Sequence, residues 1–361
     1  MLVGKYDREL SLNGRNISHG SKTYFIADIA ANHDGDLSRA LELIHLAKEA
    51  GADCAKFQHF EAKSIVSDVG FSGDLAAVSH QTGWEKSVYE IYDQYHTKLD
   101  WSQRLLSECK KAKIDFMTTP YNVEAVDLFC KHVPGFKIGS GDITYRSIIE
   151  KIAKTAKPVF LATGAADISE VIASVNLVLN HNPKICLMQC NTNYTGDTDN
   201  FQYVNLNVLK AFSTIWPGMV LGLSDHTPGH TSVLGAVALG ASVIEKHFTD
   251  DNQRIGPDHS FAMNPITWRN MVDAVGELEL AFGNGIKSIE KNEEETVIIQ
   301  RRALRLNKDM NIGDIISTGD LVALRPCPTN AMTPMEINKI IGKKLAIPKK
   351  AGEELSWPDL T

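Results

Sequence analysis

The chain has 361 residues, of which 43% are hydrophobic and 22% charged, and its formal net charge is −7. This length exceeds what one hydrophobic core usually serves, so we expect a globular protein with one large and one smaller domain. The negative charge argues against a nucleic-acid-binding surface. No run approaches the ~20 apolar residues of a membrane span, so neither nucleic acid nor membrane is an expected partner.

The compartment is predicted from the N-terminus and the cysteines. The first ten residues, MLVGKYDREL, carry charges where an export signal would need an apolar run. The six cysteines form no CxxC pair and no paired framework, which is typical of reduced thiols. We therefore expect a cytoplasmic protein.

The strongest pattern is a short apolar run that ends in polar residues or glycine and is followed by an amphipathic helical stretch. It occurs eight times, at residues 24–30, 54–60, 115–121, 136–141, 158–164, 185–191, 220–226 and 243–249. This alternation predicts an α/β fold, the (β/α)8 or TIM barrel. A doubly wound sheet is the alternative, but the glycine-rich phosphate loops GxGxxG and GxxxxGK[ST] that it would normally carry are absent from the sequence.

Two segments beside the repeats have their own signals. Residues 1–20 precede the first strand and are expected to contain a hairpin that turns at Asn13-Gly14. Residues 61–100, between the second and third strands, are too long for one helix and rich in aromatic residues. They predict a loop and an extra helix over the barrel mouth.

After the eighth repeat the pattern changes. We assign residues 1–285 to the barrel, the charged residues 286–300 to a linker and residues 301–361 to a second domain. In this domain NIGDIISTGDL (311–321) is echoed by KAGEELSWPDL (350–360), which predicts a small β-rich module with pseudo-symmetry. The tail has 10 Lys and Arg against 7 Asp and Glu, and the rest of the chain 27 against 37. A basic tail could help to hold an anionic substrate, although a solvated surface is the simpler explanation.

Strand parity predicts which side chains face the barrel interior. Alternate residues of a strand share a face, and TIM-barrel active sites lie at the carboxyl ends of the strands. Counting back from the polar ends gives an inward face that consists of Asp28, Lys56, Gln58, Thr119, Lys137, Ala162, Gln189, Asn191, Ser224, His226, Glu245 and His247. Core packing alone would place Val, Ile and Leu there, so this face predicts an active site.

The residue types on this face suggest a chemistry. Lys56 and Lys137 can neutralise a phosphate or carboxylate, with neutral donors from Thr119, Ser140 and Ser224. No Ser-His-Asp order or nucleophile elbow is present in the sequence. A Schiff base would require one of the two lysines to be neutral, so metal and phosphate chemistry fits better.

Histidines and carboxylates complete the predicted constellation. His226 and His247, at the ends of adjacent strands, can bind one divalent metal and leave positions for water and a substrate oxygen. The carboxylates available for proton transfer or for holding sugar hydroxyls are Asp28, Asp142, Glu245 and Asp258.

The motifs IADIAANHDGDL, AGADCAKFQ, FKIGSGD, LATG, GLSDHTPG, EKHFTDDNQRIGPDHSFAMNP and LRPCP extend over nearly the whole chain. Together they resemble the sialic acid (N-acetylneuraminate) synthase family. The resemblance implies a TIM barrel with a C-terminal antifreeze-like (SAF) domain, in a homodimer whose SAF domains cross over to the partner's active site. It also implies a transferase that condenses phosphoenolpyruvate with N-acetylmannosamine or a similar N-acylamino sugar aldehyde. The product is a nine-carbon 3-deoxy-2-keto acid, and phosphate leaves by C–O cleavage.

The resemblance also implies a role for each matching residue. His226 and His247 would bind Mn²⁺, with Mg²⁺ or Co²⁺ as alternatives. The phosphoenolpyruvate site would consist of Lys56, Gln58, Thr119, Lys137, Ser140 and Ser224. The sugar would contact Tyr194, Asp258 and, from the partner subunit, a residue matching Arg325. Catalytic roles would belong to Asp28, Asp142 and Glu245.

The chain departs from the family pattern at several positions, including the YPTP stretch, which reads Tyr194-Thr195-Gly196-Asp197, and a longer segment after Pro326. The usual Glu of the first motif is Asp28, the GSGE glutamate is Asp142, and the STG serine is Ala162. The acceptor depends on loops at 61–100 and 194–202. A diacetamido-dideoxy hexose or mannose, giving a legionaminate-like or Kdn-like product, is therefore an alternative to N-acetylmannosamine. A sugar-binding homologue without activity is a further alternative.

Overall fold

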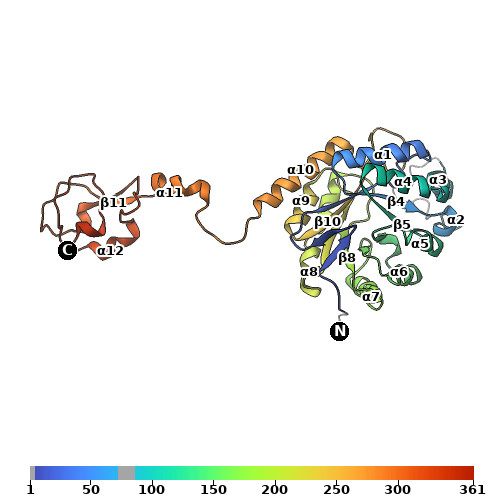
Figure 1. Cartoon of the computed structure of the whole chain (residues 1–361), viewed down its shortest axis with the longest axis horizontal. Helices are drawn as coiled ribbons and strands as arrows, with labels where there is room; N and C mark the ends of the chain where they lie inside the picture. Colours follow the sequence, from blue (N-terminus) through green and yellow to red (C-terminus); the bar gives the residue numbers. More distant parts are fainter. Residues whose placement is uncertain (1–4, 72–85) are drawn as a thin grey trace. The chain divides into compact units, whose positions relative to one another are not determined.

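The computed structural model describes residues 5–71 and 86–361 (Figure 1). The chain divides into two compact units, Met1–Phe282 and Gly283–Thr361. The first unit contains every strand and helix that the eightfold repeat predicts, and the second is a small unit with its own apolar core.

Eight parallel strands of the first unit close into a barrel in the order β10-β3-β4-β5-β6-β7-β8-β9 (Figure 1). Their bounds are β3 (Tyr24–Asp28), β4 (Cys54–His59), β5 (Asp115–Pro120), β6 (Phe136–Ile138), β7 (Val159–Ala162), β8 (Ile185–Cys190), β9 (Val220–Asp225) and β10 (Ala241–His247). Seven strands lie within the predicted apolar runs and β10 begins two residues before the eighth run, so the predicted TIM barrel is confirmed and a doubly wound sheet is excluded.

Helices follow the strands and cover the outside of the barrel (Figure 1). They are α1 (Leu37–Ala50), α4 (Ser102–Ala112), α5 (Val123–Phe129), α6 (Arg146–Ala153), α7 (Ile168–Leu179), α8 (Val208–Ile215), α9 (Thr231–Ala238) and α10 (Pro265–Ala281). Helix α1 illustrates the local signals. The Asp36 side chain caps its first turn, and Gly51, with a φ of 102°, ends it in the left-handed conformation. Its apolar face, including Leu43 and Ile44, packs in the layer between helices and strands.

The amino-terminal end of the barrel is closed by a hairpin of β1 (Glu9–Leu12) and β2 (Arg15–Ser18). It turns, as predicted, at Asn13 and Gly14, whose φ angles of 46° and 87° suit a tight hairpin turn. Its apolar side chains join the lower barrel interior in one buried cluster of Leu10, Leu12, Ile17, Tyr24, Ile26, Cys54, Met117, Phe160, Cys186, Met188, Val220 and Val243. This apolar cluster fills the amino-terminal half of the barrel interior. A polar site inside the barrel can therefore lie only at the carboxyl end.

The segment between β4 and α4 contributes to the opposite, carboxyl end. It contains the short helix α2 (Ala62–Ile65) and the helix α3 (Val88–Tyr95), whose first turn has a capping box formed by Ser87 and Glu90. The extra helix predicted between the second and third strands is therefore present. Residues 72–85 of this segment lie outside the described residues.

The second unit contains α11 (Glu294–Gln300), the antiparallel pair β11 (Ala303–Leu306) and β12 (Leu321–Leu324), and α12 (Ile337–Ile340). The sequence echo is visible in its structure. Ser317 and Ser356 each begin a 3-10 turn by a capping box with the aspartate three residues later, Asp320 or Asp359. Lys308 and Lys349 form ion pairs with these two aspartates at 2.5 and 2.7 Å. The two halves therefore repeat the same local structure.

A search of the helices in residues 5–71 and 86–361 finds none with the length and apolarity to cross a membrane.

Candidate active site

The strand register brings the predicted polar residues together at the carboxyl end of the barrel. Asp28, the last residue of β3, is paired with Lys56 on β4 and with His247 on β10. Glu245 lies two residues before His247 on the same face, and it is paired with Ser224 of β9. Five residues from four different strands are therefore neighbours, because the strands are parallel and in this register.

Two lysines and two carboxylates form the centre of the site. The Lys56 ammonium donates a hydrogen bond to Asp28 Oδ2 at 2.7 Å and lies 3.6 Å from Glu245 Oε1. The Lys137 ammonium, from β6, lies 3.1 Å from the same Glu245 oxygen. These side chains are at most 5% exposed. The centre is thus a buried network of alternating charges.

Both carboxylates of this network are ionised. Burial alone would raise the pKa of Asp28, but Lys56 outweighs burial and holds this pKa below its usual value. The pKa of Glu245 is likewise lowered, because Lys137 and Lys56 together outweigh its burial. With both lysines charged, the net charge of the four groups is zero.

Neutral donors surround the charged centre. Lys56 also donates to the Thr119 hydroxyl at 3.2 Å, and the Gln58 amide donates to Asp28 at 3.0 Å. The Ser224 hydroxyl donates to Glu245 Oε1 at 3.1 Å. The other oxygen of Glu245 is buried and has no hydrogen-bond partner within the described part of the chain. A water molecule or a substrate group is expected to satisfy it.

The two histidines lie beside this centre, with ring centroids 5.4 Å apart. His226 Nδ1 is 2.9 Å from the carbonyl oxygen of Asn191. Because a carbonyl can only accept, this nitrogen carries the hydrogen, so the ring in its neutral form presents a lone pair on Nε2. His247 Nε2 is 3.7 Å from Asp28 Oδ2, and its Nδ1 is 3.6 Å from Asp258 Oδ2. This Nδ1 is buried without a hydrogen-bond partner among the described residues.

A divalent metal ion fits this donor set. Imidazole nitrogens with carboxylates nearby and room for oxygen ligands suit an ion such as Mn²⁺. In residues 5–71 and 86–361, no three His, Cys, Asp or Glu side chains are arranged to hold a metal together. His226 and His247 would therefore supply only part of the coordination shell. The buried Nδ1 of His247, which makes no hydrogen bond within the described part of the chain, is compatible with such an ion.

An aromatic-lined cavity lies next to the histidines. The rings of Tyr194 and His226 meet edge to face with their centroids 4.5 Å apart. The rings of Phe261 and His247 meet in the same way with their centroids 4.9 Å apart. Asp258 is held in place because its Oδ2 accepts a hydrogen bond from the backbone of Ala31 at 3.1 Å. The cavity measures about 200 Å³ and is lined by Ala31, Gln58, Phe60, Ile91, Tyr92, Tyr95, Tyr121, Tyr194, His247, Pro257 and Asp258.

Ser140 and Asp142 occupy a 3-10 turn directly after β6. The buried Ser140 hydroxyl accepts a hydrogen bond from the backbone of Gly164, in the loop after β7, at 3.0 Å. Asp142 is half-buried, and burial raises the pKa of its carboxyl group to about 6. A carboxyl group with this pKa can exchange a proton near neutral pH.

We expect the raised pKa of Asp142 to affect stability. Between its usual pKa of 3.8 and about 6, the folded chain binds a proton that the unfolded chain has lost. The contribution of Asp142 to the free energy of unfolding therefore falls as pH rises through this window. Asp142→Asn should gain about 1 kcal/mol relative to wild type between pH 5 and pH 7. Urea unfolding at several pH values measures this difference, and a constant offset between the two proteins would contradict the raised pKa.

The parity assignment was wrong for β8. Cys186 and Met188 belong to the interior cluster, so Cys190 shares the inward parity and Gln189 and Asn191 do not. Leu187, by contrast, packs in the outer layer. Strand β8 is buried on both faces, so its apolar residues carry no sign of which parity faces inward. The prediction therefore relied on the polar residues at the end of the strand. Counting back from them assigned the inward face to the wrong set of alternate residues.

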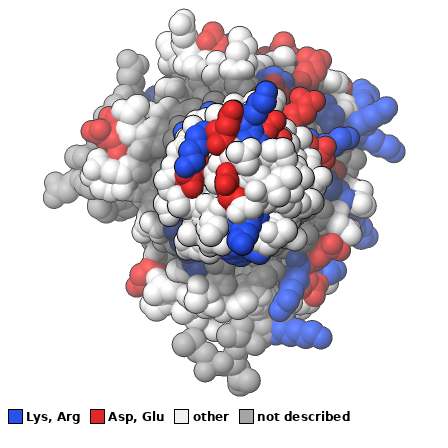
Figure 2. All heavy atoms as spheres, turned by 90° about the vertical axis from the view of Figure 1, so that its left-hand side faces the viewer, with Lys and Arg blue, Asp and Glu red and all other residues white. Residues whose placement is uncertain are grey.

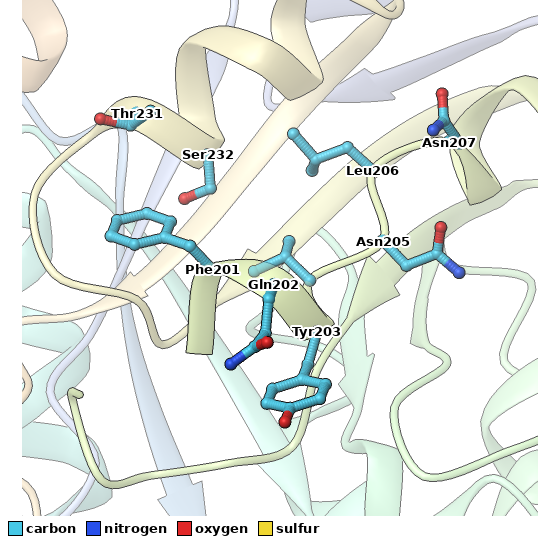
Figure 3. Close-up of a pocket in the computed structure, with 9 residues that line it drawn as sticks. Phe201, Gln202, Tyr203, Asn205, Leu206, Asn207, Thr231 and Ser232 are labelled. Atoms are coloured by element: carbon cyan, nitrogen blue, oxygen red, sulfur yellow. The ribbon is translucent and has the colours of Figure 1, made fainter. Parts of the chain in front are cut away.

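Gln189 and Asn191 instead hold a neighbouring segment. Their amides donate to the carbonyl oxygens of Val204 and Tyr203, at 2.9 and 3.3 Å. This segment and the start of α9 line a surface depression of about 710 Å³ (Figure 3). Asn191 also accepts the hydrogen bond of His226, so it orients a candidate metal ligand. Nothing in the sequence indicated that the backbone carbonyl of Asn191 would orient His226.

Two other predicted positions, Ala162 and Arg325, are not among the polar side chains that the barrel strands carry. Ala162 has the inward parity of Phe160, and its methyl group offers no hydrogen-bond donor. Arg325 lies in the second unit, directly after β12, and is exposed. The barrel unit thus brings Asp28, Lys56, Lys137, Glu245 and the two histidines together, whereas Arg325 lies in the second unit.

The closed barrel belongs to the TIM-barrel class, whose active sites lie at the carboxyl end where the polar residues gather. Comparison with known sequences gives the family: residues 43–287 match the NeuB family and residues 301–361 match the SAF domain. The chain belongs to the NeuB family of nonulosonic acid synthases, with a C-terminal SAF domain.

Individual relatives agree with this assignment. The chain is 35% identical to N,N'-diacetyllegionaminic acid synthase of Campylobacter jejuni, over 89% of this chain and 95% of the relative. It is 33% identical to the protein of the same name from Legionella pneumophila, over 96% and 97%. Among solved structures, the N-acetylneuraminic acid synthetase of Leptospira borgpetersenii aligns with a TM-score of 0.69 at 25% identity, covering 81% of this chain and 96% of that chain.

Proposed function

We propose that this protein joins phosphoenolpyruvate to an N-acylamino sugar aldehyde, giving a nine-carbon 3-deoxy-2-keto sugar acid and phosphate. The observation that carries the proposal is the buried group of two lysines and two carboxylates beside two histidines. An anion, a proton-transfer group and a metal ion can meet there.

Phosphoenolpyruvate suits the lysine side of the site. Its carboxylate and phosphate can each bind one of the ammonium groups of Lys56 and Lys137. Because Asp28 and Glu245 already balance these two charges, the bound substrate would leave a buried excess of negative charge. A divalent cation at the histidines would offset that excess. The neutral donors available to the substrate are Gln58, Thr119, Ser140 and Ser224.

In the proposed reaction, the enol π electrons of phosphoenolpyruvate form a bond from its C3 to the aldehyde carbon. The aldehyde oxygen takes up a proton. Water adds to C2 and loses one proton. The C2–O bond to phosphate then breaks while the remaining hydroxyl proton passes to the departing phosphate, which leaves the keto group. Asp28, Glu245 and Asp142 are the candidates for moving these protons. Asp28 and Glu245 are already hydrogen-bonded in the centre, and the pKa of Asp142 is close to neutral pH.

His226 and His247 are the residues that would hold Mn²⁺, or Mg²⁺ or Co²⁺. The bound ion supplies a Lewis acid that favours negative charge on a carbonyl oxygen. The chain's own side chains orient the rest of the sugar. Tyr194 packs against His226, and Asp258 offers a carboxylate to sugar hydroxyls next to His247.

Two acceptors are candidates. N-acetylmannosamine or a similar sugar would give a sialic acid-like product. A diacetamido-dideoxy hexose is favoured by the Campylobacter and Legionella relatives, whose names specify a diacetyl product. The aromatic wall that includes Phe60, Tyr92 and Tyr121 also suits this acceptor, because aromatic faces pack well against acetamido methyl groups.

The function is tested by incubating the protein with phosphoenolpyruvate, Mn²⁺ and each of N-acetylmannosamine, a diacetamido-dideoxy hexose and mannose. Phosphate release and a product mass equal to both substrates plus water minus phosphoric acid are expected. With ¹⁸O in the bridging position of phosphoenolpyruvate, the label should appear in phosphate. Acceptor-independent phosphate release would contradict a synthase. Metal binding without turnover of any acceptor would favour a sugar-binding homologue.

Lys137→Met should raise the Michaelis constant for phosphoenolpyruvate by roughly 10²-fold and leave that for the sugar almost unchanged. The substitution removes one anion partner and leaves Glu245 with Lys56 alone. Steady-state kinetics with each substrate varied in turn measures the effect. The matched control is Lys151→Met, which removes a surface lysine that pairs with Asp127 at 2.6 Å. Equal increases for both substrates would indicate general damage to the site.

We further propose that the active form is a homodimer in which the second unit completes the partner's site with Arg325. Several apolar side chains of this unit are exposed, among them Met335 at 91% and Ile312 at 67%. Ile255, in the loop that carries Asp258, is 94% exposed. On the face of the second unit seen in Figure 2, charges of both signs lie around a broad uncharged area. A second copy of the chain would cover such surfaces.

The dimer is tested by mixing two inactive proteins, Lys56→Met and Arg325→Ala, and allowing subunits to exchange. A crossed-over mixed dimer has one intact site and one doubly defective site, so about a quarter of wild-type activity should return at equal amounts. Differently tagged subunits verify the exchange. Exchange without recovered activity would show that Arg325 acts within its own chain or has no part in the reaction.

A further inference from the structure

The residues that precede the two candidate metal ligands form a buried ion pair on the reverse face of the same strands. Asp225 precedes His226 and Lys246 precedes His247, and β9 and β10 pair Asp225 directly with Lys246. Because adjacent strand residues point to opposite faces, this pair lies outside the barrel interior. Both side chains are at most 2% exposed, and neither takes part in the proposed chemistry.

Each polar group of this pair has a defined partner. The Lys246 ammonium donates to Asp225 Oδ2 and to the Thr227 carbonyl oxygen. The Thr227 hydroxyl donates to Asp225, and so does the Ser232 hydroxyl, at 2.7 Å, from the first turn of α9. Figure 3 shows Ser232 at this turn, where it also lines the surface depression. One ammonium and one carboxylate therefore connect β9, β10 and α9.

This network holds the backbone on both sides of His226. Asp225 and Thr227 are its two chain neighbours, and both are bonded to Lys246. Lys246 in turn precedes His247, whose direction follows from the same strand backbone. The backbone that carries both rings is therefore held by the Asp225–Lys246 pair, which we call the clamp. The rings themselves lie on the opposite face and do not contact this pair.

We infer that the Asp225–Lys246 pair is a positioning device that fixes the spacing of His226 and His247 for a shared divalent ion. The inference rests on the metal site of the proposed function. Residues behind metal ligands that orient them commonly change metal affinity about 10-fold to 100-fold when replaced. A pair that served only folding would alter stability and leave the affinity of the folded protein unchanged.

The test measures Mn²⁺ binding to the full chain by electron paramagnetic resonance, in the absence of substrates. Lys246→Met leaves Asp225 as an unpaired buried charge, so the double variant Asp225→Asn/Lys246→Met serves if the single variant does not fold. The matched control is Val175→Ala, which makes a cavity in the buried face of α7. Phosphoenolpyruvate binding without metal is measured in parallel, because Lys56 and Lys137 lie on the other face.

We expect the folded clamp variant to bind Mn²⁺ about 10-fold to 100-fold more weakly than wild type. Its bound-Mn²⁺ spectrum should change, and its metal-free phosphoenolpyruvate affinity should not. Val175→Ala should retain wild-type Mn²⁺ affinity. Wild-type Mn²⁺ affinity in the clamp variant would overturn the inference while leaving the proposed function intact. Wild-type protein that binds no divalent metal would overturn the metal site and this inference together.

Discussion

His247→Ala is expected to lower metal-dependent turnover by about 10³-fold or more while the barrel stays folded. The ring contributes one of two imidazoles that the register of β9 and β10 places side by side. Without it, a divalent ion would retain one protein nitrogen and lose its position beside Asp28. His226→Ala should have the same effect, because neither imidazole alone can hold the ion between substrate and protein.

The experiment measures turnover and bound metal in the same preparations. Circular dichroism verifies the fold. His45→Ala is the matched control, because this ring is 45% exposed and pairs with Glu108 on the outer helices at 2.8 Å. It should retain full turnover and metal content. Undiminished activity of His247→Ala in the presence of a chelator would rule out a metal role for this residue.

Asp28→Asn is expected to lose about 10²-fold to 10⁴-fold in turnover and to bind phosphoenolpyruvate at least as tightly as wild type. Asp28 accepts hydrogen bonds from Lys56 and Gln58 and lies 3.7 Å from His247, so it adjoins both halves of the site. Replacement by the amide removes a proton acceptor. It also changes the net charge of the four central groups from zero to +1, which favours an anionic substrate.

Calorimetric titration with phosphoenolpyruvate and single-turnover kinetics separate these two effects. The comparison variant is Glu245→Gln, which makes the same change of charge on a neighbouring strand. If both variants bind well and only one loses turnover, that one carries the proton transfer. A turnover of Asp28→Asn near the wild-type rate would assign the role to Glu245 or Asp142.

The fold could be predicted because its signals are local. Eight apolar runs with helical stretches between them are enough to specify a (β/α)8 barrel, since parallel strands joined by helices have few other closed arrangements. The turn at Asn13 and Gly14 was equally local, because two consecutive positive φ angles favour these residue types. The repeat within 301–361 was visible for the same reason.

The residues of the candidate site could be predicted on strands where only one of the two sets of alternate residues is polar. On β4, Lys56 and Gln58 alternate with Ala55 and Phe57 of the outer layer, so their common face was evident. On β8 both parities are apolar, and the sequence led to Gln189 instead of Cys190. Parity therefore works only where the two faces of a strand differ in polarity.

The sequence by itself determined the barrel, the order of its strands, the family and which residue types face the carboxyl end. Only the tertiary structure decided which charges pair, because distances such as that from Lys137 to Glu245 depend on two strands that are far apart in sequence. The same holds for the clamp of Asp225 and Lys246, whose role depends on strand register and on a helix turn. Local patterns specify elements and their faces, whereas contacts between elements arise only when the barrel closes.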